Sequence, residues 1–128
     1  MPKILTIDDS SMARRMNRAI LEQAGYDVLE ADGPDQGLEK VQLEQPDLVL
    51  LDLLMPGVEE ETEIVKHIRA LAPHIPIVIV SSNIQEAVRT AVVAAGASGF
   101  LPKPVKSAQL LPEVQRVLGD ESGITHTA

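Results

Sequence analysis

The sequence predicts an α/β domain with a doubly wound parallel sheet, and two observations carry that prediction. Short β-branched runs alternate with longer stretches of helical periodicity, which implies parallel strands, right-handed crossovers and helices on both faces. Aromatic residues make up only 2% of the 128 residues, so Val, Ile, Leu and Ala must build the core, as is typical of a buried parallel sheet. The length suits one domain, expected over residues 1–119, with a disordered tail over 120–128.

Five runs are expected to form the strands. The runs at 48–51 and 76–80 are apolar on both faces, which indicates central strands. The run at 26–31 is polar enough to lie at or near an edge of the sheet. In chain order the expected strands are 3–7, 26–31, 48–51, 76–80 and 98–101.

A segment with helical spacing follows each expected strand. Ser10 or Ser11 can cap the first helix, and Gly25 can stop it. Pro34 suits the first turn of the second helix, and Ser107 can cap the fifth. The expected apolar positions are Ala13, Met16, Ile20 and Ala24; then Leu38 and Val41; then Ile64, Val65, Ile68 and Leu71; then Ile84, Val88, Ala91, Val92 and Ala95; and finally Leu110, Leu111, Val114, Val117 and Leu118.

Charge and composition argue against several classes of protein. The net charge of −8 argues against direct nucleic-acid binding, because phosphate contacts need clustered Lys and Arg. No apolar run approaches the roughly 18 residues that cross a membrane, and no long apolar signal segment precedes the first acidic pair. With no Cys, a disulfide, a thiolate metal site and a cysteine nucleophile are all excluded. We therefore expect a cytoplasmic protein without a membrane partner.

Polar residues interrupt the apolar pattern just past the carboxyl ends of four expected strands. Asp8 and Asp9 follow the first strand and Asp52 follows the third. Ser81 follows the fourth and Lys103 the fifth. Any one of these residues is more often a turn, a cap or a surface residue. Their shared position favours a site, because open α/β sheets bind ligands at these strand ends.

The residue types predict phosphoryl chemistry at that site. Three clustered carboxylates repel one another unless a cation compensates, and Mg²⁺ suits one or two carboxylates with water and phosphate oxygens. Lys103 and the Ser81 hydroxyl could each meet a phosphoryl oxygen. Because this set holds no Cys and no His, the best nucleophile is a carboxylate, which would form an acyl phosphate.

Five segments together resemble the receiver domain of two-component response regulators, especially stand-alone, CheY-like ones. The resemblance covers roughly residues 3–118 and implies a flavodoxin-like three-layer sandwich with strand order 2-1-3-4-5. It would make residues 1–119 a receiver domain. The segments are Ile7-Asp8-Asp9-Ser10, Leu51-Asp52-Leu53-Leu54-Met55-Pro56-Gly57, Val80-Ser81-Ser82, Ala94-Ala95-Gly96-Ala97 and Phe100-Leu101-Pro102-Lys103-Pro104.

The resemblance also implies roles for individual residues. Asp52 would accept a phosphoryl group from a phosphohistidine on a sensor histidine kinase or a phosphotransfer protein. Ser81 and Lys103 would bind the phosphoryl oxygens, and the Lys103–Pro104 peptide bond would be cis. Asp8 would bind the metal directly or through water. The implied Mg²⁺ ligands are Asp8, Asp9, Asp52 and the backbone carbonyl of Leu54.

Such a domain is a switch rather than a turnover enzyme. The resemblance implies that Phe100 turns inward when Ser81 moves toward the phosphate, although plain core packing of Phe100 stays an alternative. The face of the fourth helix, fifth strand and fifth helix would then change its affinity for a downstream protein. We expect slow autodephosphorylation and a monomer, with a phosphorylation-linked dimer as the alternative.

Three departures from the family pattern stand out. The acidic loop Glu59–Glu63 replaces a second glycine, which either favours the start of the third helix or selects partners. Leu54 and Asn83 flank the route of an attacking water, and Leu54 cannot orient water, which predicts a long-lived phosphoryl group. Pro102 precedes Lys103, as an edge strand tolerates. The histidines lack metal-ligand spacing and are expected at the surface; they are His67, His74 and His126.

Two rival functions stay open at this point. An Asp-nucleophile phosphohydrolase uses similar groups, but it usually has its nucleophile on the first strand, a second Asp two residues later, and a cap. A binding module that is never phosphorylated typically loses one acidic residue, whereas this set is complete.

Overall fold

A computed structural model describes residues 1–55, 60–82 and 85–119. Strands and helices alternate, and all the strands pair in parallel in the order β2-β1-β3-β4-β5, which confirms the predicted topology. The elements are β1 (Lys3–Ile7), α1 (Ser11–Gln23), β2 (Asp27–Ala31), α2 (Pro34–Glu44), β3 (Leu48–Leu51), α3 (Glu61–Leu71), β4 (Ile77–Ser81), α4 (Glu86–Ala95), β5 (Gly99–Pro102) and α5 (Ser107–Val117).

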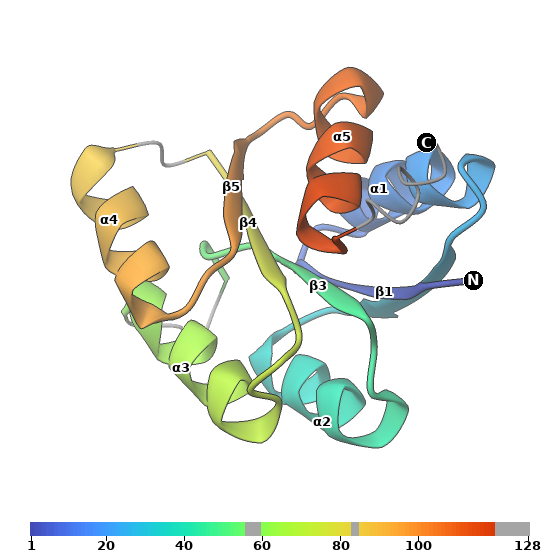
Figure 1. Cartoon of the computed structure of the whole chain (residues 1–128). Coiled ribbons are helices and arrows are strands. Elements are labelled where there is room, and N and C mark those ends of the chain that lie inside the picture. The colour runs from blue at the N-terminus through green and yellow to red at the C-terminus, as the bar shows by residue number, and fades with distance from the viewer. Residues whose placement is uncertain (56–59, 83–84, 120–128) are drawn as a thin grey trace.

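Helices cover both faces of the sheet and make three layers. Helices α1 and α5 lie on one face, and α2, α3 and α4 lie on the other (Figure 1). Successive strand side chains point to opposite faces, so Leu5 joins the core under α2, α3 and α4 while Ile4 joins the core under α1 and α5. Strands β1, β3 and β4 are apolar on both faces because both faces are covered.

The ends of the helices agree with most of the sequence signals. The Ser10 side chain caps α1 by accepting a hydrogen bond from the Ala13 N–H at 3.1 Å. Gly25 follows that helix with φ of 97°, a conformation that favours glycine, and Pro34 begins α2. The prediction for Ser107 was wrong: Ser107 is the first residue of α5, and Lys106 precedes it as an N-cap without a side-chain bond.

The buried face of α1 also differs from the prediction. Asn17 and Leu21 are its buried residues, whereas Met16 is 47% exposed and Ala24 is exposed. The Asn17 amide donates to the hydroxyl of Thr6 on β1 at 3.3 Å, so a polar pair lies where periodicity places an apolar contact. Counting apolar residues could not find the true face, because one of its members is an asparagine.

Smaller differences affect α3, α4 and the strand limits. Leu71 and Ala91 are exposed rather than buried, and β4 and β5 each lie one residue later than expected. The expectations for Ile84, Asn83, residues 56–59 and the tail at 120–128 fall outside the described residues. In the part of the chain that the structure describes, no helix has both the length and the apolar character needed to cross a bilayer.

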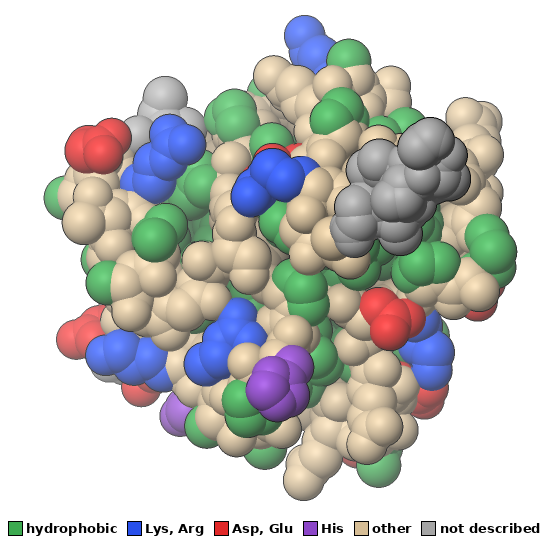
Figure 2. Space-filling view, in the orientation of Figure 1, with side chains coloured by type: hydrophobic (Ala, Val, Ile, Leu, Met, Phe, Trp, Pro, Cys, Tyr) green, Lys and Arg blue, Asp and Glu red, His purple; other side chains and the backbone are tan. Residues whose placement is uncertain are grey.

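Charge is dispersed over the face of the molecule in Figure 2. Lys and Arg side chains stand apart from one another there, with acidic and apolar side chains between them.

Candidate phosphoryl and metal site

The predicted polar residues meet at the carboxyl edge of the sheet. Asp8 and Asp9 leave β1, Asp52 leaves the adjacent β3, and Lys103 leaves β5. Ser81 is the last residue of β4 rather than the residue after it, and it is fully buried. Because these strands are neighbours in a parallel sheet, their carboxyl ends deliver all these groups to one place.

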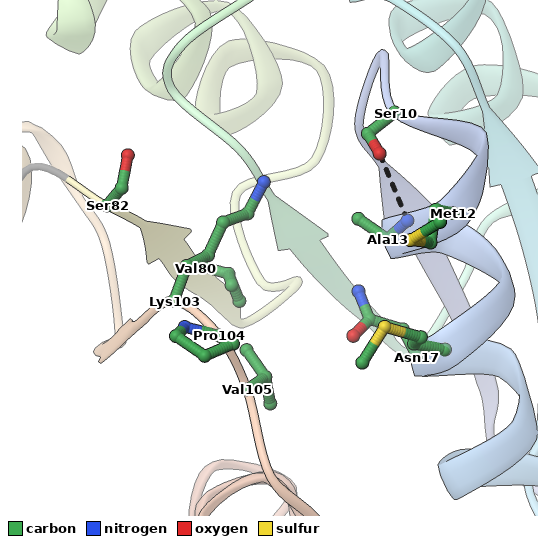
Figure 3. Close-up of a pocket in the computed structure, with 10 residues that line it drawn as sticks. Ser10, Met12, Ala13, Asn17, Val80, Ser82, Lys103, Pro104 and Val105 are labelled. Atoms are coloured by element: carbon green, nitrogen blue, oxygen red, sulfur yellow. Dashed lines mark hydrogen bonds between the residues drawn. The ribbon is translucent and has the colours of Figure 1, made fainter.

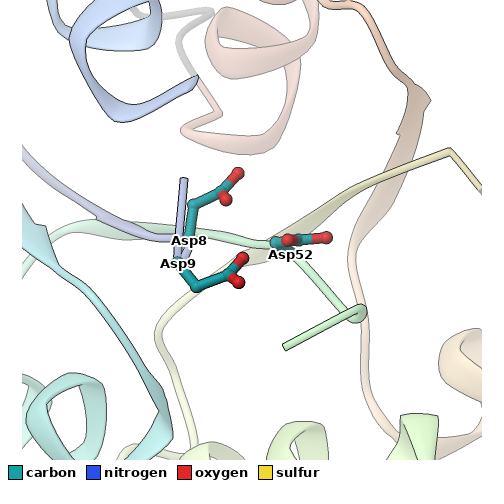
Figure 4. A group of neighbouring side chains, drawn as sticks. All are labelled: Asp8, Asp9 and Asp52. Carbon is teal, nitrogen blue, oxygen red and sulfur yellow. The ribbon is translucent and has the colours of Figure 1, made fainter. Parts of the chain in front are cut away.

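Three carboxylates converge in that place. Figure 4 shows the side chains of Asp8, Asp9 and Asp52 pointing into the same space. Their ligand oxygens all lie within 4.8 Å of one another. Asp8 is 2% exposed and Asp52 is 4% exposed, whereas Asp9 is exposed to solvent. The cluster is therefore buried on one side and open on the other.

The Lys103 ammonium bridges the two buried carboxylates. Its Nζ lies 2.8 Å from Asp8 Oδ2 and 3.4 Å from Asp52 Oδ2. Backbone amides hold the other oxygens: Ser10 N–H donates to Asp8 Oδ1 at 2.9 Å, and Leu54 N–H donates to Asp52 Oδ1 at 3.1 Å. Both carboxylates are thus fixed in orientation by one amide and one cation.

The backbone at Lys103 fixes that ammonium to the sheet. The Lys103 N–H donates to the Ser81 carbonyl at 3.0 Å, which extends the β4–β5 pairing by one residue. The peptide bond between Lys103 and Pro104 is cis, the geometry that the family resemblance implied. Pro102 lies on β5, an edge strand, where a missing N–H is tolerated.

Burial and charge perturb two of these groups. Burial, together with the nearby Asp8 charge, raises the pKa of Asp52 from 3.8 to about 6, against the opposing effects of the Leu54 amide and Lys103. Burial alone would lower the pKa of Lys103, but the hydrogen bond to Asp8 and the attraction of Asp52 raise it. The site therefore holds a permanent cation beside a carboxylate that is costly to ionise.

The donor set fits a hard divalent cation. Mg²⁺ prefers oxygen ligands and commonly binds through one or two carboxylates while keeping several waters. Here two oriented carboxylates lie beside a third that is open to solvent, so water has access to the metal position. A cation would also relieve the repulsion that raises the pKa of Asp52.

The remaining predicted residues lie outside the carboxylate cluster. Leu54 is two residues past Asp52 and is 50% exposed. Phe100 lies on β5, packs partly buried against the core under α2, α3 and α4, and has the Arg89 guanidinium 5.6 Å from its ring centroid. His67 and His74 are exposed, as expected; His126 lies outside the described residues.

A hollow of about 400 Å³ adjoins the site and was not predicted. Its walls come from the start of α1 and from the segment around Lys103, with Asn17 at one side (Figure 3). Met12 and Met16 border it on α1, and both are exposed. Sequence could not reveal it, because it forms between segments about 90 residues apart. It is lined by Ser10, Met12, Ala13, Met16, Asn17, Val80, Ser82, Lys103, Pro104 and Val105.

The fold is an open, parallel α/β sheet with a cluster of carboxylates and a lysine at the carboxyl ends of its strands. The model of the response regulator receiver domain matches residues 4–115, and the chain belongs to that family. Receiver domains are in general phosphorylation-dependent switches that bind Mg²⁺ and interact with histidine kinases or phosphotransfer proteins and with effectors. They are signalling switches rather than turnover enzymes.

Similar proteins include both single-domain and longer regulators. The chain is 34% identical to the protein PilH of Pseudomonas aeruginosa, over 92% of this chain and 98% of PilH. The response regulator MprA of Mycobacterium leprae is 31% identical over 91% of this chain, which spans only 50% of MprA. Among solved structures, the chemotaxis protein CheY4 of Vibrio cholerae superposes with a TM-score of 0.84 and 34% identity, over 91% of this chain and 98% of CheY4.

Proposed function

We propose that this protein is a phosphorylation switch whose acceptor is Asp52. The observation that carries the proposal is the convergence of three carboxylates, two of which pair with the Lys103 ammonium, with Asp52 buried and oriented among them. A sensor histidine kinase or a phosphotransfer protein would supply the phosphoryl group from a phosphohistidine.

The transfer exchanges one bond to phosphorus for another. A carboxylate oxygen of Asp52 forms a bond to phosphorus, the bond from phosphorus to the donor imidazole nitrogen breaks, and that nitrogen takes the electron pair and then a proton. The Leu54 amide holds Oδ1, and Lys103 faces Oδ2, so the carboxylate is aimed before the donor arrives. Lys103 is placed to bind a phosphoryl oxygen as negative charge develops.

Asp8, Asp9, Asp52 and the Leu54 carbonyl would hold the Mg²⁺. When bound, the ion supplies charge neutralisation to the carboxylates and to the phosphoryl oxygens. Asp8 orients Lys103 through its 2.8 Å ion pair and is in turn oriented by the Ser10 amide. The Ser81 hydroxyl at the end of β4 would donate to another phosphoryl oxygen.

The signal would pass from the site to the face of α4, β5 and α5. A phosphoryl group adds about −1.5 to −2 charges and three acceptor oxygens, which changes what Ser81 and Lys103 bind. Those residues are joined through the Lys103 N–H and the Ser81 carbonyl, and Phe100 lies three residues before Lys103 on β5. Phe100 is half-buried beneath Arg89 and would move inward as Ser81 moves toward the phosphate.

The hollow between α1 and the Lys103 segment would receive apolar side chains of the phosphoryl donor. It shares Lys103 with the site, so a protein that presents a phosphohistidine to Asp52 must lie against it. The exposed Met12 and Met16 offer flexible apolar contact there. A cytoplasmic location and a monomeric state remain predictions from the sequence.

Intact mass after incubation with Mg²⁺ and acetyl phosphate tests the proposal. We expect one added phosphoryl group that is stable in acid and labile in base, as an acyl phosphate is. The adduct must be absent from Asp52→Asn, and its persistence there would reject Asp52 as the acceptor. Release of free phosphate over many turnovers at enzyme-like rates would instead indicate a phosphohydrolase.

A further inference from the structure

Arg14 on α1 ties the backbone of the acidic loop to a neighbouring strand. Its Nη1 donates to the Asp8 carbonyl oxygen at 2.6 Å, and its Nε donates to Glu30 Oε1 on β2 at 2.9 Å. The side chain is only 16% exposed. Because both ends of this contact are fixed, the guanidinium acts as a rigid bridge from β2 to the loop that carries Asp8 and Asp9.

This bridge matters most for Asp9. Amides and Lys103 hold the carboxylates of Asp8 and Asp52, but no hydrogen bond or ion pair to any described residue holds the Asp9 carboxylate. Its direction must therefore come from the backbone. The Asp8 carbonyl belongs to the peptide unit that leads into Asp9, so a bond to that oxygen sets the plane from which the Asp9 side chain departs.

We propose that Arg14, held by Glu30, is a positioning residue for the magnesium site, acting through the Asp8–Asp9 peptide. This inference rests on the metal site proposed above. The Asp8 N–H, which donates to the Ala31 carbonyl at 3.1 Å, fixes the other side of Asp8 to β2. Strand β2 thus supports the acidic loop at two points, one main-chain and one through Arg14.

Glu30 not only holds the Arg14 side chain but also offsets its positive charge. A lone guanidinium close to the carboxylate cluster would repel a divalent cation. Glu30 also pairs with Arg18 through Oε2, and Arg18 pairs with Glu22 at 3.0 Å, so two cations and two anions balance. Burial alone would raise the pKa of Glu30, but the hydrogen bonds from Arg18 and Arg14 lower it, which keeps Glu30 ionised at neutral pH.

Arg14→Gln tests the proposal, and Arg18→Gln is its matched control. Both residues lie on α1 and both bind Glu30, but only Arg14 contacts Asp8. The chain has no Trp, so backbone-amide NMR shifts of Asp9 and Ser10 are the suitable probe in a titration with Mg²⁺ alone. We expect Arg14→Gln to raise the Kd for Mg²⁺ about tenfold, the usual loss when a residue supporting a metal ligand is removed. Arg18→Gln should stay within about twofold of the wild type.

Further readouts separate positioning from general stability. At saturating Mg²⁺ the phosphorylation rate of Arg14→Gln should return to within about twofold of the wild type, because a positioning loss acts on metal affinity. Arg14→Lys keeps the charge but cannot reach both partners, and Glu30→Gln removes the offsetting charge; each should give an intermediate Kd. These two variants also carry the test if Arg14→Gln does not fold.

The outcomes are distinct. Equal Kd values for Arg14→Gln, Arg14→Lys and the wild type would overturn the role of Arg14. Equal weakening by Arg14→Gln and Arg18→Gln, in step with their unfolding temperatures, would also overturn it and leave only a structural role. Absence of Mg²⁺ binding by the wild type would instead overturn the metal site on which this inference rests.

Discussion

Two partly buried cations lie at opposite ends of the sheet, and their surroundings differ in kind. Lys103, past the carboxyl end of β5, lies between the carboxylates of Asp8 and Asp52. Arg69 lies at the amino ends of β4 and β5, where its donors reach only backbone carbonyls among the residues that the structure describes. Those carbonyls belong to Ala72, Pro73, Ile75 and Gly96.

The difference shows how one fold separates two kinds of environment. We call the carboxyl end of the sheet around Lys103 the responsive end, and the amino end around Arg69 the fixed end. Carboxylates raise the pKa of Lys103, overcoming the effect of its burial, whereas burial without a carboxylate lowers the pKa of Arg69. The partners of Lys103 can change charge by binding a proton, a metal or a phosphoryl group. Carbonyls cannot, so Arg69 only fixes the ends of α3 and α4 relative to the sheet.

The largest expected effect comes from removing the cation at the responsive end. Lys103→Met should slow phosphorylation by acetyl phosphate at least about 100-fold, because one preorganised charge is lost where negative charge develops. The rate is measured by intact mass at saturating Mg²⁺. Lys106→Met, an exposed lysine on the same loop, should change the rate by less than about twofold. Wild-type reactivity in Lys103→Met would remove the lysine from the chemistry.

Removing the cation at the fixed end should damage stability instead. Arg69→Ala removes the guanidinium donor from four carbonyls, of which that of Ala72 still accepts from the Ile75 N–H at 3.3 Å, and it should lower the free energy of unfolding by about 2–3 kcal/mol. Urea denaturation measures this change, and the phosphorylation rate of the folded variant should match the wild type. Arg116→Ala loses only the Ser98 carbonyl and the Glu113 ion pair at the exposed surface, and should cost less than about 1 kcal/mol. An equal loss in the two variants would contradict the fixed role of Arg69.

Burial of the Asp52 carboxylate at the responsive end should lower the free energy of unfolding by an amount that depends on pH. The pKa of Asp52 is about 6 in the folded protein and 3.8 in its ordinary state, so the folded protein binds more protons between these values. Its stability therefore falls as pH rises through that window, and the full penalty is present at pH 7. Asp52→Asn should then be more stable than the wild type by about 2 kcal/mol at pH 7 without metal.

The same comparison has two internal checks. Near pH 4 the advantage of Asp52→Asn should disappear, because the wild-type carboxyl is then largely protonated in the folded state. Added Mg²⁺ should stabilise the wild type more than the variant, since only the wild type keeps all three carboxylates. A variant no more stable than the wild type at pH 7 would show that burial of the Asp52 charge carries no such penalty.

The sequence was informative about the responsive end because its signals are local. Asp8, Asp52 and Lys103 each interrupt an apolar run at a strand end, and a parallel sheet brings such ends together without further information. The shared position of the three carboxylates at one edge of the sheet was therefore predictable, whereas the strand order was predicted from the family resemblance. The end of β4 was predicted one residue too early, before Ser81, because a serine interrupts the apolar run even though Ser81 is fully buried in the strand.

The fixed end and the face of α1 were not predictable for physical reasons. Arg69 satisfies carbonyls from two separate segments, and backbone acceptors have no residue-type signature. Arg14 likewise binds the carbonyl of Asp8, which any residue could provide. Asn17 is buried because Thr6 accepts its hydrogen bond, a pairing that depends on the rotation of α1 about its axis. Such contacts follow from tertiary geometry rather than from periodicity.

The smallest expected effect concerns the lifetime of the phosphorylated protein. The Leu54 N–H donates to the Asp52 carboxylate, while the half-exposed Leu54 side chain offers no group to orient an attacking water. Leu54→Asn should speed decay of the phosphorylated protein roughly fivefold, or about 1 kcal/mol in the barrier, with little change in stability. Decay is followed by intact mass after acetyl phosphate is removed. Leu43→Asn, at an exposed leucine on α2, should leave the decay unchanged. Equal decay in Leu54→Asn and the wild type would show that water reaches the phosphoryl group by a route that this side chain does not control.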